Sequence, residues 1–264
     1  MAEKLVLAVD TGNTHTVLGC IHEDGHIAPV LRLETNDRRT EFEYAADLSR
    51  ILEISGVEIA AIRGCIISSV VPSMNETLSE AVRMLTGEEA MLVGAGVETG
   101  LEIAIPDPGT IAADLVATAV AAKEKFALPC FIIDMGTATT VTVVDERGRY
   151  LGGAIYPGAG ISLNALVHGT SLLPNIAIEP PGRAVGRNTV EAMKSGMFYS
   201  VVGGLDGVLD RFEAEFGKPG TIVATGGIAS RVTPFCRHRI VLAEELLLEG
   251  LAIIYRKNHG AASL

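Results

Sequence analysis

The sequence contains no tryptophan, and aromatic residues make up only 5% of its 264 residues. Positive charge is also scarce, because 32 acidic residues outnumber 21 lysines and arginines and leave a formal net charge of −11. A protein that binds a nucleic-acid backbone normally presents a basic patch, so nucleic acid is not an expected partner. The composition, 48% hydrophobic and 20% charged, is that of a folded globular chain and excludes intrinsic disorder.

Long hydrophobic runs are absent as well. The apolar stretches have the length of strands and are bounded by Gly, Asp or Pro, so we expect no membrane contact. The first of them, residues 5–9, ends in an acid and does not resemble a signal peptide. Cysteine is sparse, and its four positions (Cys20, Cys65, Cys130 and Cys236) form no CxxC pair. We therefore expect reduced thiols in core or strand positions of a cytoplasmic protein.

Two segments of the chain, residues 5–27 and 130–152, resemble each other. In each, an apolar strand ends in Asp (Asp10 or Asp134), one residue and a Gly follow, and then come a Thr-rich stretch and a second strand. This pattern predicts a β-hairpin. Its repetition predicts a chain of two related halves.

The repeated turns carry specific chemistry. A Gly lets the backbone approach a ligand closely, and backbone N–H groups with Thr hydroxyls can surround phosphate oxygens. An Asp at the strand end can hold a cation, directly or through water. One such turn alone is more often a plain hairpin turn, but two copies at matching places favour a polyphosphate site. A third Gly-rich element, residues 220–230, suits an adenosine subsite.

Strands and helices alternate along the sequence, which indicates an α/β fold. We predict helices over residues 39–55, 74–85, 162–168, 189–216 and 243–258. The boundary between the halves is expected near residues 123–128, which gives domains of residues 1–123 and 124–264.

The stretch "PDPGTIAADLVATAVAA" predicts one more helix, with Asp107 as its N-cap and Pro108 at its first position. It contains a carboxylate, Asp114, among small and apolar residues. The residues alone leave two interpretations open, a solvated surface acid or a catalytic base.

Several long motifs, including "DTGNTHTVLG", "DMGTATTVTVVD" and "VGRNTVEAMKSGMFY", resemble the type III pantothenate kinases. The resemblance runs nearly end to end. It implies the α/β fold of the acetate kinase/sugar kinase/Hsp70/actin superfamily, with two ribonuclease-H-like domains and ATP between them. It also implies a homodimer that phosphorylates pantothenate with ATP in the first step of coenzyme A biosynthesis.

Roles for individual residues follow from this resemblance alone. It implies Asp114 as the general base and Asp10 near Mg²⁺, with Asp134 binding a monovalent cation, K⁺ or NH₄⁺. The implied ATP contacts are Asp10, Thr11, Gly12, Asn13, Thr14, His15, Thr16, Val17 and Thr137. The implied substrate-binding positions are Ile105, Ala112, Ala113, Asp114, Leu115 and Thr189.

Three of these substrate positions depart from the family pattern. Ile105 stands where the family has Tyr, Ala112 where it has Gly, and Leu115 where it has Arg; Gly169 stands in place of a second Arg. Arg is the natural bidentate partner of a carboxylate such as that of pantothenate. Losing one charge-assisted hydrogen bond costs about 1.5–3 kcal/mol.

These departures leave three alternatives. The chain is a pantothenate kinase that holds the carboxylate in another way, a kinase for a less anionic hydroxyl compound, or a catalytically weak paralogue that binds ATP and regulates. A competing class, an ATPase or filament protein of the same fold, is disfavoured by the short chain, which leaves no room for a substrate or insertion domain.

Overall fold

The computed structural model describes residues 4–260, which form two compact units. Within the described part, residues 4–101, 106–121 and 245–260 belong to the first unit, and residues 102–105 and 122–244 to the second. The division predicted above, residues 1–123 and 124–264, differs at residues 102–105, 122–123 and 245–260. Residues 102–105 join the second unit because their strand pairs there, and residues 245–260 join the first because their helix packs there.

The first unit is built on a five-stranded sheet of order β3-β2-β1-β4-β5. Strands β1 and β2 form a hairpin, β3 continues it antiparallel, and β4 and β5 add parallel strands. The strand bounds are β1 (Leu5–Thr11), β2 (His15–Ile21), β3 (Ile27–Glu34), β4 (Ile62–Ser69) and β5 (Ala90–Leu92).

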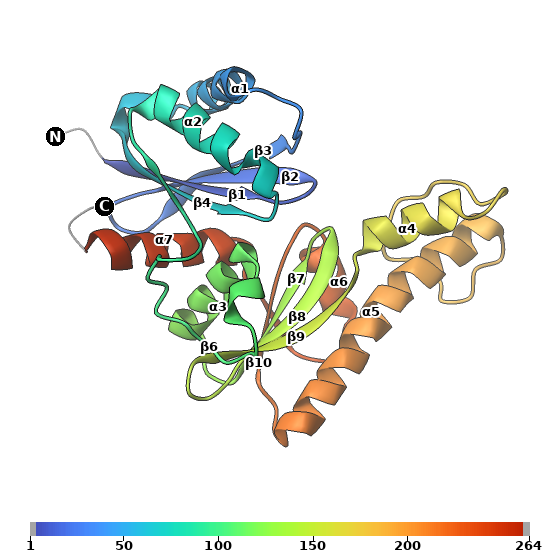
Figure 1. Cartoon of the computed structure of the whole chain (residues 1–264). Coiled ribbons are helices and arrows are strands. Elements are labelled where there is room, and N and C mark those ends of the chain that lie inside the picture. Colours follow the sequence, from blue (N-terminus) through green and yellow to red (C-terminus); the bar gives the residue numbers. More distant parts are fainter. Residues whose placement is uncertain (1–3, 261–264) are drawn as a thin grey trace. The chain divides into compact units, whose positions relative to one another are not determined.

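Helices cover both faces of this sheet (Figure 1). On one face, Tyr44 and Leu48 of α1 (Glu41–Ile54) and Leu78 of α2 (Asn75–Thr86) share a core with Leu7 and Val9 of β1. The other face receives α7 (Leu246–His259), which contacts β1, β2 and β4. Local signals set the helix ends: Thr40 closes a capping box on α1, and Gly87 ends α2 in the left-handed conformation.

The second unit repeats this plan with a six-stranded sheet of order β11-β10-β7-β8-β9-β6. Strands β7, β8 and β9 form the antiparallel meander, and β10 and β11 are the added parallel strands. The order β9-β8-β7-β10-β11 matches β3-β2-β1-β4-β5, which confirms two related halves. The bounds are β6 (Glu102–Ile103), β7 (Cys130–Met135), β8 (Ala138–Val144), β9 (Arg149–Pro157), β10 (Thr221–Thr225) and β11 (Ile240–Leu242).

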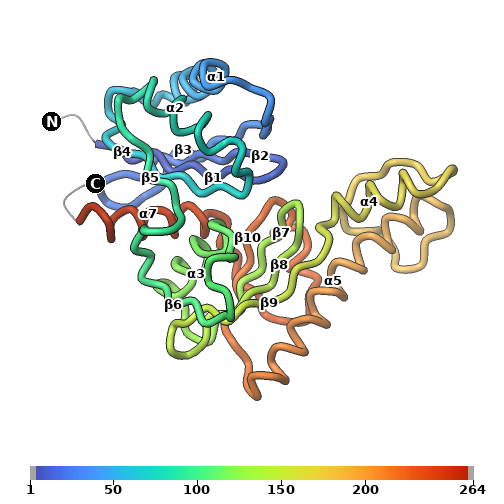
Figure 2. Tube along the Cα trace, in the orientation of Figure 1, coloured from blue at the N-terminus to red at the C-terminus, as the bar shows by residue number. Residues whose placement is uncertain are grey.

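The long helix α5 (Thr189–Phe216) covers one face of the second sheet from Phe198 to its C-terminal end. There Phe198, Leu205 and Leu209 pack with Phe131 and Ile133 of β7, and α6 (Ala229–Val232) completes this core. The N-terminal part of α5 extends beyond the sheet beside α4 (Ala159–His168) (Figure 2). A small separate core joins α4, α5 and the connecting segment: Leu163, Met193 and Met197, with Leu173 and Ile176 against them.

Most predicted elements are confirmed, but α4 begins at Ala159 and not at residue 162, α7 begins at Leu246 and not at residue 243, and the predicted start of α3 (Ala113–Lys125) is wrong. Helix α5 has the predicted bounds, and both predicted hairpins form. Helix α3 does not begin after Asp107. Asp107 and Pro108 instead open a short 3-10 turn, Pro108–Thr110, and the extended backbone of Ile111 separates this turn from α3.

The four cysteines are free thiols, as predicted. Cys20, Cys65 and Cys130 are buried in strands, whereas Cys236 is half-buried and lies outside any strand. Within residues 4–260, no helix is long and apolar enough to cross a membrane.

Candidate active site

The first glycine turn, which joins β1 to β2, is an exposed hairpin tip that hydrogen bonds from Thr35 hold in place. The Gly12 N–H donates to the carbonyl of His15 at 3.0 Å. Thr35, which follows β3, donates its hydroxyl to the Gly12 carbonyl at 2.8 Å and its N–H to the Thr14 carbonyl at 3.0 Å. The carbonyls of the turn are thus held toward Thr35. The structure brings all the predicted ATP contacts from Asp10 to Val17 into this one strand-turn-strand unit.

Asp10 lies near the end of β1, with Ser68 of the parallel strand β4 at the paired position. Paired positions of neighbouring strands present their side chains on the same face of a sheet. Ser68 is fully buried, and its hydroxyl has no hydrogen-bond partner in the described structure. The Ser68 hydroxyl, which makes no hydrogen bond in the described structure, therefore lies on the same face as the Asp10 carboxylate. Two oxygen ligands of this kind suit a hydrated hard cation such as Mg²⁺.

The second glycine turn joins β7 to β8, and two further glycines pack against it. The Gly158 N–H donates to the Thr137 carbonyl at 3.1 Å, and a Cβ at Gly158 would lie 2.3 Å from that oxygen. Gly226, at φ +98°, lies against the backbone of Met135, where a Cβ would approach within 2.6 Å. The turn at Thr137 therefore meets the start of α4 and the Gly-rich end of β10, the element predicted to hold adenosine.

Asp134 has a hydroxyl neighbour on each side. Its paired residues are Thr140 on β8 and Thr225 on β10. The Thr225 hydroxyl donates to the carbonyl of Glu244 at 3.0 Å, whereas the buried Thr140 hydroxyl has no partner in the described chain. A carboxylate beside an unused hydroxyl fits a hard cation that prefers oxygen ligands.

The first turn of α3 carries Asp114, which is half-buried. One carboxylate oxygen accepts the Leu115 N–H at 2.7 Å. Burial raises the pKa of the Asp114 carboxyl, since the charged form loses water, and the hydrogen bond from Leu115 opposes this rise. A raised pKa brings a carboxylate nearer to the basicity that a general base needs at neutral pH.

The predicted substrate positions divide between the two units. Ala112, Ala113 and Leu115 accompany Asp114 at the start of α3 in the first unit. Ile105 lies in the second unit, just after β6, where its side chain faces Gly152. Thr189 is the first residue of α5, also in the second unit, and is exposed.

Several residues of interest were not predicted from the sequence. The hydroxyls of Ser68 and Thr140 attract notice only once the strand register places them beside Asp10 and Asp134. Arg183 and Arg187 line an open pocket just before α5. The sequence Gly-Arg-Asn-Thr places Arg187 two residues before the predicted substrate position Thr189, but it does not show which arginines lack an acidic partner. Between residues 4 and 260, no three His, Cys, Asp or Glu side chains gather into a metal-binding group.

Comparison with solved structures identifies the fold. The chain superposes on a proposed 2-dehydro-3-deoxygalactonokinase from Sinorhizobium meliloti with a TM-score of 0.62, at 14% identity and 97% coverage of both chains. It also matches the activator of 2-hydroxyisocaproyl-CoA dehydratase from Clostridium difficile, solved with bound ADPNP, with a TM-score of 0.57, 12% identity and 98% coverage of both chains. The chain therefore shares the α/β fold of these two proteins.

Sequence comparison then identifies the family. The family model for type III pantothenate kinase matches residues 6–211. The type III pantothenate kinase of Halalkalibacterium halodurans is 39% identical over 254 residues, which cover 96% of this chain and 100% of that protein. The chain belongs to the type III pantothenate kinase family, whose members are phosphotransferases with an alcohol acceptor.

Proposed function

We propose that this protein transfers the γ-phosphoryl group of ATP to the primary hydroxyl of pantothenate, giving 4′-phosphopantothenate in the first step of coenzyme A biosynthesis. The near-complete match to type III pantothenate kinases carries this proposal. The two glycine turns, each preceded by a strand-end Asp, support it.

Phosphoryl transfer depends mainly on positioning, on neutralisation of charge and on a group that orients the nucleophile. In the proposed mechanism, Asp114 accepts the proton of the attacking hydroxyl, and its raised pKa suits that role. Residues Asp10–Val17 and Thr137 contact ATP, and Thr189 contacts the acceptor. Mg²⁺ near Asp10 and K⁺ or NH₄⁺ at Asp134, when bound, would offset the negative charge of the phosphates.

A coupled assay of ADP release tests the proposal, with pantothenate, ATP, Mg²⁺ and K⁺ present and Asp114→Asn run beside the unsubstituted chain. Turnover that Asp114→Asn reduces by about 10²-fold or more supports a general base at this position. Tight ATP binding without turnover of pantothenate would overturn the proposed activity.

A second candidate function, phosphorylation of a less anionic alcohol, is favoured by one observation. Ile105, Ala112 and Leu115 make the predicted acceptor positions more apolar than the family pattern. Faster turnover of neutral hydroxyl compounds than of pantothenate in the same assay would select this alternative. ATP binding without turnover of any alcohol would select the third alternative, a catalytically weak paralogue that binds ATP and regulates.

We also propose that the protein is a homodimer working in a reducing, cytoplasmic compartment, which its free thiols suit. The hairpin of α4 and α5 exposes large apolar side chains that a second copy could cover. They are Ile161, Leu166, Leu172, Val190 and Tyr199. Light scattering coupled to size exclusion tests the dimer, and a Leu172→Asp, Leu166→Asp variant should dissociate it.

A further inference from the structure

The segment that leads into α5, residues 182–188, is fixed against the first turns of that helix. The Ser195 hydroxyl donates to the Ala184 carbonyl, and the Arg187 N–H donates to the Glu191 carboxylate at 2.9 Å. A Cβ at Gly186 would lie 2.3 Å from the Ala192 nitrogen, so this glycine permits close contact with the helix. The side chains of the segment therefore project from a backbone that is already in place.

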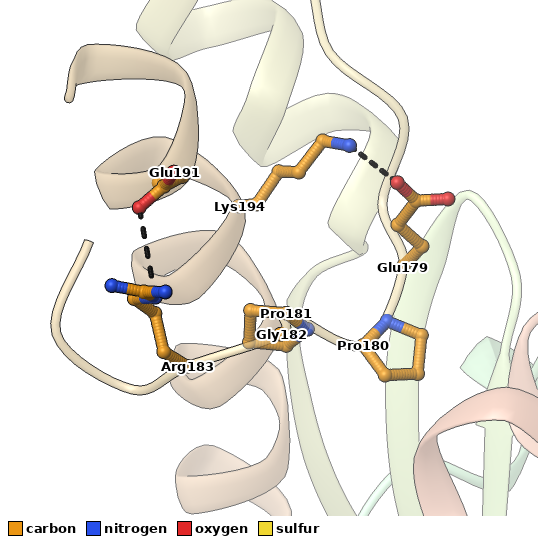
Figure 3. A pocket seen from close by; sticks show the side chains of 7 residues that line it. All are labelled: Glu179, Pro180, Pro181, Gly182, Arg183, Glu191 and Lys194. Carbon is orange, nitrogen blue, oxygen red and sulfur yellow. Dashed lines mark hydrogen bonds and ion pairs between the residues drawn. The ribbon is translucent and has the colours of Figure 1, made fainter. Parts of the chain in front are cut away.

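Positive charge gathers on this segment. Gly182, Arg183, Val185 and Arg187 line an open pocket of about 410 Å³, and no acidic residue lines it. A neighbouring pocket of about 330 Å³ lies between residues 179–183 and α5 (Figure 3). In that second pocket Lys194 is paired with Glu179, and Arg183 faces Glu191 with 4.0 Å between Nε and Oε2.

Arg187 differs from these two cations. Within residues 4–260 its guanidinium contacts no carboxylate, and only its backbone N–H bonds to Glu191. The Arg183–Glu191 pair is itself long and about half-exposed, so it competes weakly with another anion. Glu191 is occupied further by the helix cap, since it accepts from the side-chain amide of Asn188 at 3.0 Å. The first pocket thus offers one unpaired and one weakly paired guanidinium.

The place of this pocket in the fold relates it to the acceptor. Arg187 stands two residues before Thr189, the position proposed to contact pantothenate. The resemblance to the family implies an arginine at each of two positions where this chain has Leu115 and Gly169, and neither of these residues can pair with a carboxylate. A carboxylate that leaves water needs a compensating charge, and guanidinium provides it with bidentate geometry.

We infer that Arg187, assisted by Arg183, binds the carboxylate of the acceptor and so takes over the role of the missing family arginines. This inference rests on the proposed function. It explains how a chain with Leu115 selects an anionic acceptor, and it makes Arg187 a specificity-determining residue.

The test compares two acceptors in the ADP-release assay: pantothenate, and pantothenol, in which a hydroxymethyl group replaces the carboxylate. Arg187→Gln should raise KM for pantothenate about 10- to 100-fold, the equivalent of one charge-assisted hydrogen bond. The KM values for pantothenol and for ATP should change less than about twofold, because neither compound has a carboxylate for Arg187 to bind. Arg187→Lys should restore part of the loss, since it restores charge without bidentate geometry.

Arg211→Gln, at an exposed arginine in the C-terminal part of α5, is the matched control and should leave both acceptors unchanged. Thermal melting confirms that each variant is folded. An unchanged KM for pantothenate in Arg187→Gln, or an equal rise for both acceptors, overturns this inference alone. No turnover of pantothenate by the unsubstituted chain overturns the proposed function.

Discussion

The carboxylate of Asp114 accepts the backbone N–H of the next residue, Leu115, at 2.7 Å, in the first turn of α3. A negative charge at this end of a helix is favoured by the helix dipole. Burial acts in the opposite direction and is the larger influence, so the pKa of Asp114 lies above that of a solvated aspartate. A partly desolvated but oriented carboxylate has the properties that proton abstraction needs.

Asp114→Asn should reduce turnover by about 10²-fold or more and at the same time stabilise the fold at neutral pH. Folding raises the pKa of this carboxyl, so its contribution to stability is complete below the unfolded pKa and is lost as pH rises through the folded pKa. Removing the charge therefore helps most at neutral pH. A rise in melting midpoint of about 2–4 °C at pH 7 would correspond to roughly 1 kcal/mol.

The gain from Asp114→Asn should shrink as pH falls below the folded pKa, where aspartate is already neutral. A midpoint at pH 7 equal to or lower than that of the unsubstituted chain would show that the ionised carboxylate is not penalised by burial. The acid limb of kcat in the unsubstituted protein should likewise lie above the pKa of a free aspartate.

Leu115→Arg should improve the use of pantothenate by placing an arginine beside Asp114, the proposed general base. We expect KM for pantothenate to fall by about tenfold, and the gain to be larger in an Arg187→Gln background, where the carboxylate has lost its proposed partner. Steady-state kinetics in both backgrounds measures this, with pantothenol as the acceptor that should show no gain. If neither background responds to pantothenate, the acceptor carboxylate does not approach the start of α3.

Much of this architecture was predictable, because local patterns encode it. The repeated Asp-x-Gly turns identified both hairpins, and the helix predicted over residues 189–216 has the bounds of α5. The start of α3 was wrong for a local reason. Asp107 accepts the Gly109 N–H, and the Thr110 hydroxyl donates to the Asp107 carbonyl at 2.7 Å. Asp107 therefore caps the short 3-10 turn Pro108–Thr110 and not α3, because the backbone of Ile111 is extended and ends that turn.

The candidate site was predictable only in part. The glycine turns and Asp114 stand out in the sequence, but their neighbours depend on contacts that strand register and folding create. Thr35 donates a hydrogen bond to Gly12 from 23 residues away in the chain, and Ser68 takes the position beside Asp10 only because β1 and β4 pair in parallel. No sequence pattern shows that the Arg187 guanidinium lacks an acidic partner. Glu191, the nearby acid, instead accepts the Arg187 N–H and the Asn188 amide and faces Arg183, and only the structure shows these contacts.

Gly250→Ala should destabilise the first unit, because α3 and α7 touch at this glycine. A Cβ at Gly250 would lie 1.9 Å from the Ala117 carbonyl oxygen, and both groups are helix backbone that cannot turn aside. We expect a loss of about 1–3 kcal/mol in the free energy of unfolding, as for other overpacked cores. Urea denaturation measures it.

Gly203→Ala, in α5, is the control for Gly250→Ala, since nothing lies within 4 Å of the added methyl group. It should stabilise the protein by about 0.4–1 kcal/mol, because alanine restricts the unfolded chain and favours helix. Equal effects of the two substitutions would contradict the close contact between α3 and α7.

Thr140→Val should weaken the response to monovalent cations without harming the fold. The Thr140 hydroxyl is buried, lacks a partner in the described chain and lies at the paired position to Asp134. Removing an unpaired buried hydroxyl is neutral or stabilising by itself. If that hydroxyl is a cation ligand, the K⁺ concentration for half-maximal effect should rise about tenfold, the equivalent of roughly 1.4 kcal/mol. Both the K⁺-dependent rise in melting midpoint and the K⁺ activation of turnover report it.

Thr142→Val provides the matched control for Thr140→Val. Thr142 lies two residues further along β8, and its hydroxyl is likewise buried and unpaired among the described residues. It is paired with Ile132, however, and not with Asp134. The two valine variants should therefore share any gain in stability, and only Thr140→Val should shift the K⁺ response. If both shift it equally, the effect comes from the packing of β8, and Asp134 binds its cation without a threonine hydroxyl.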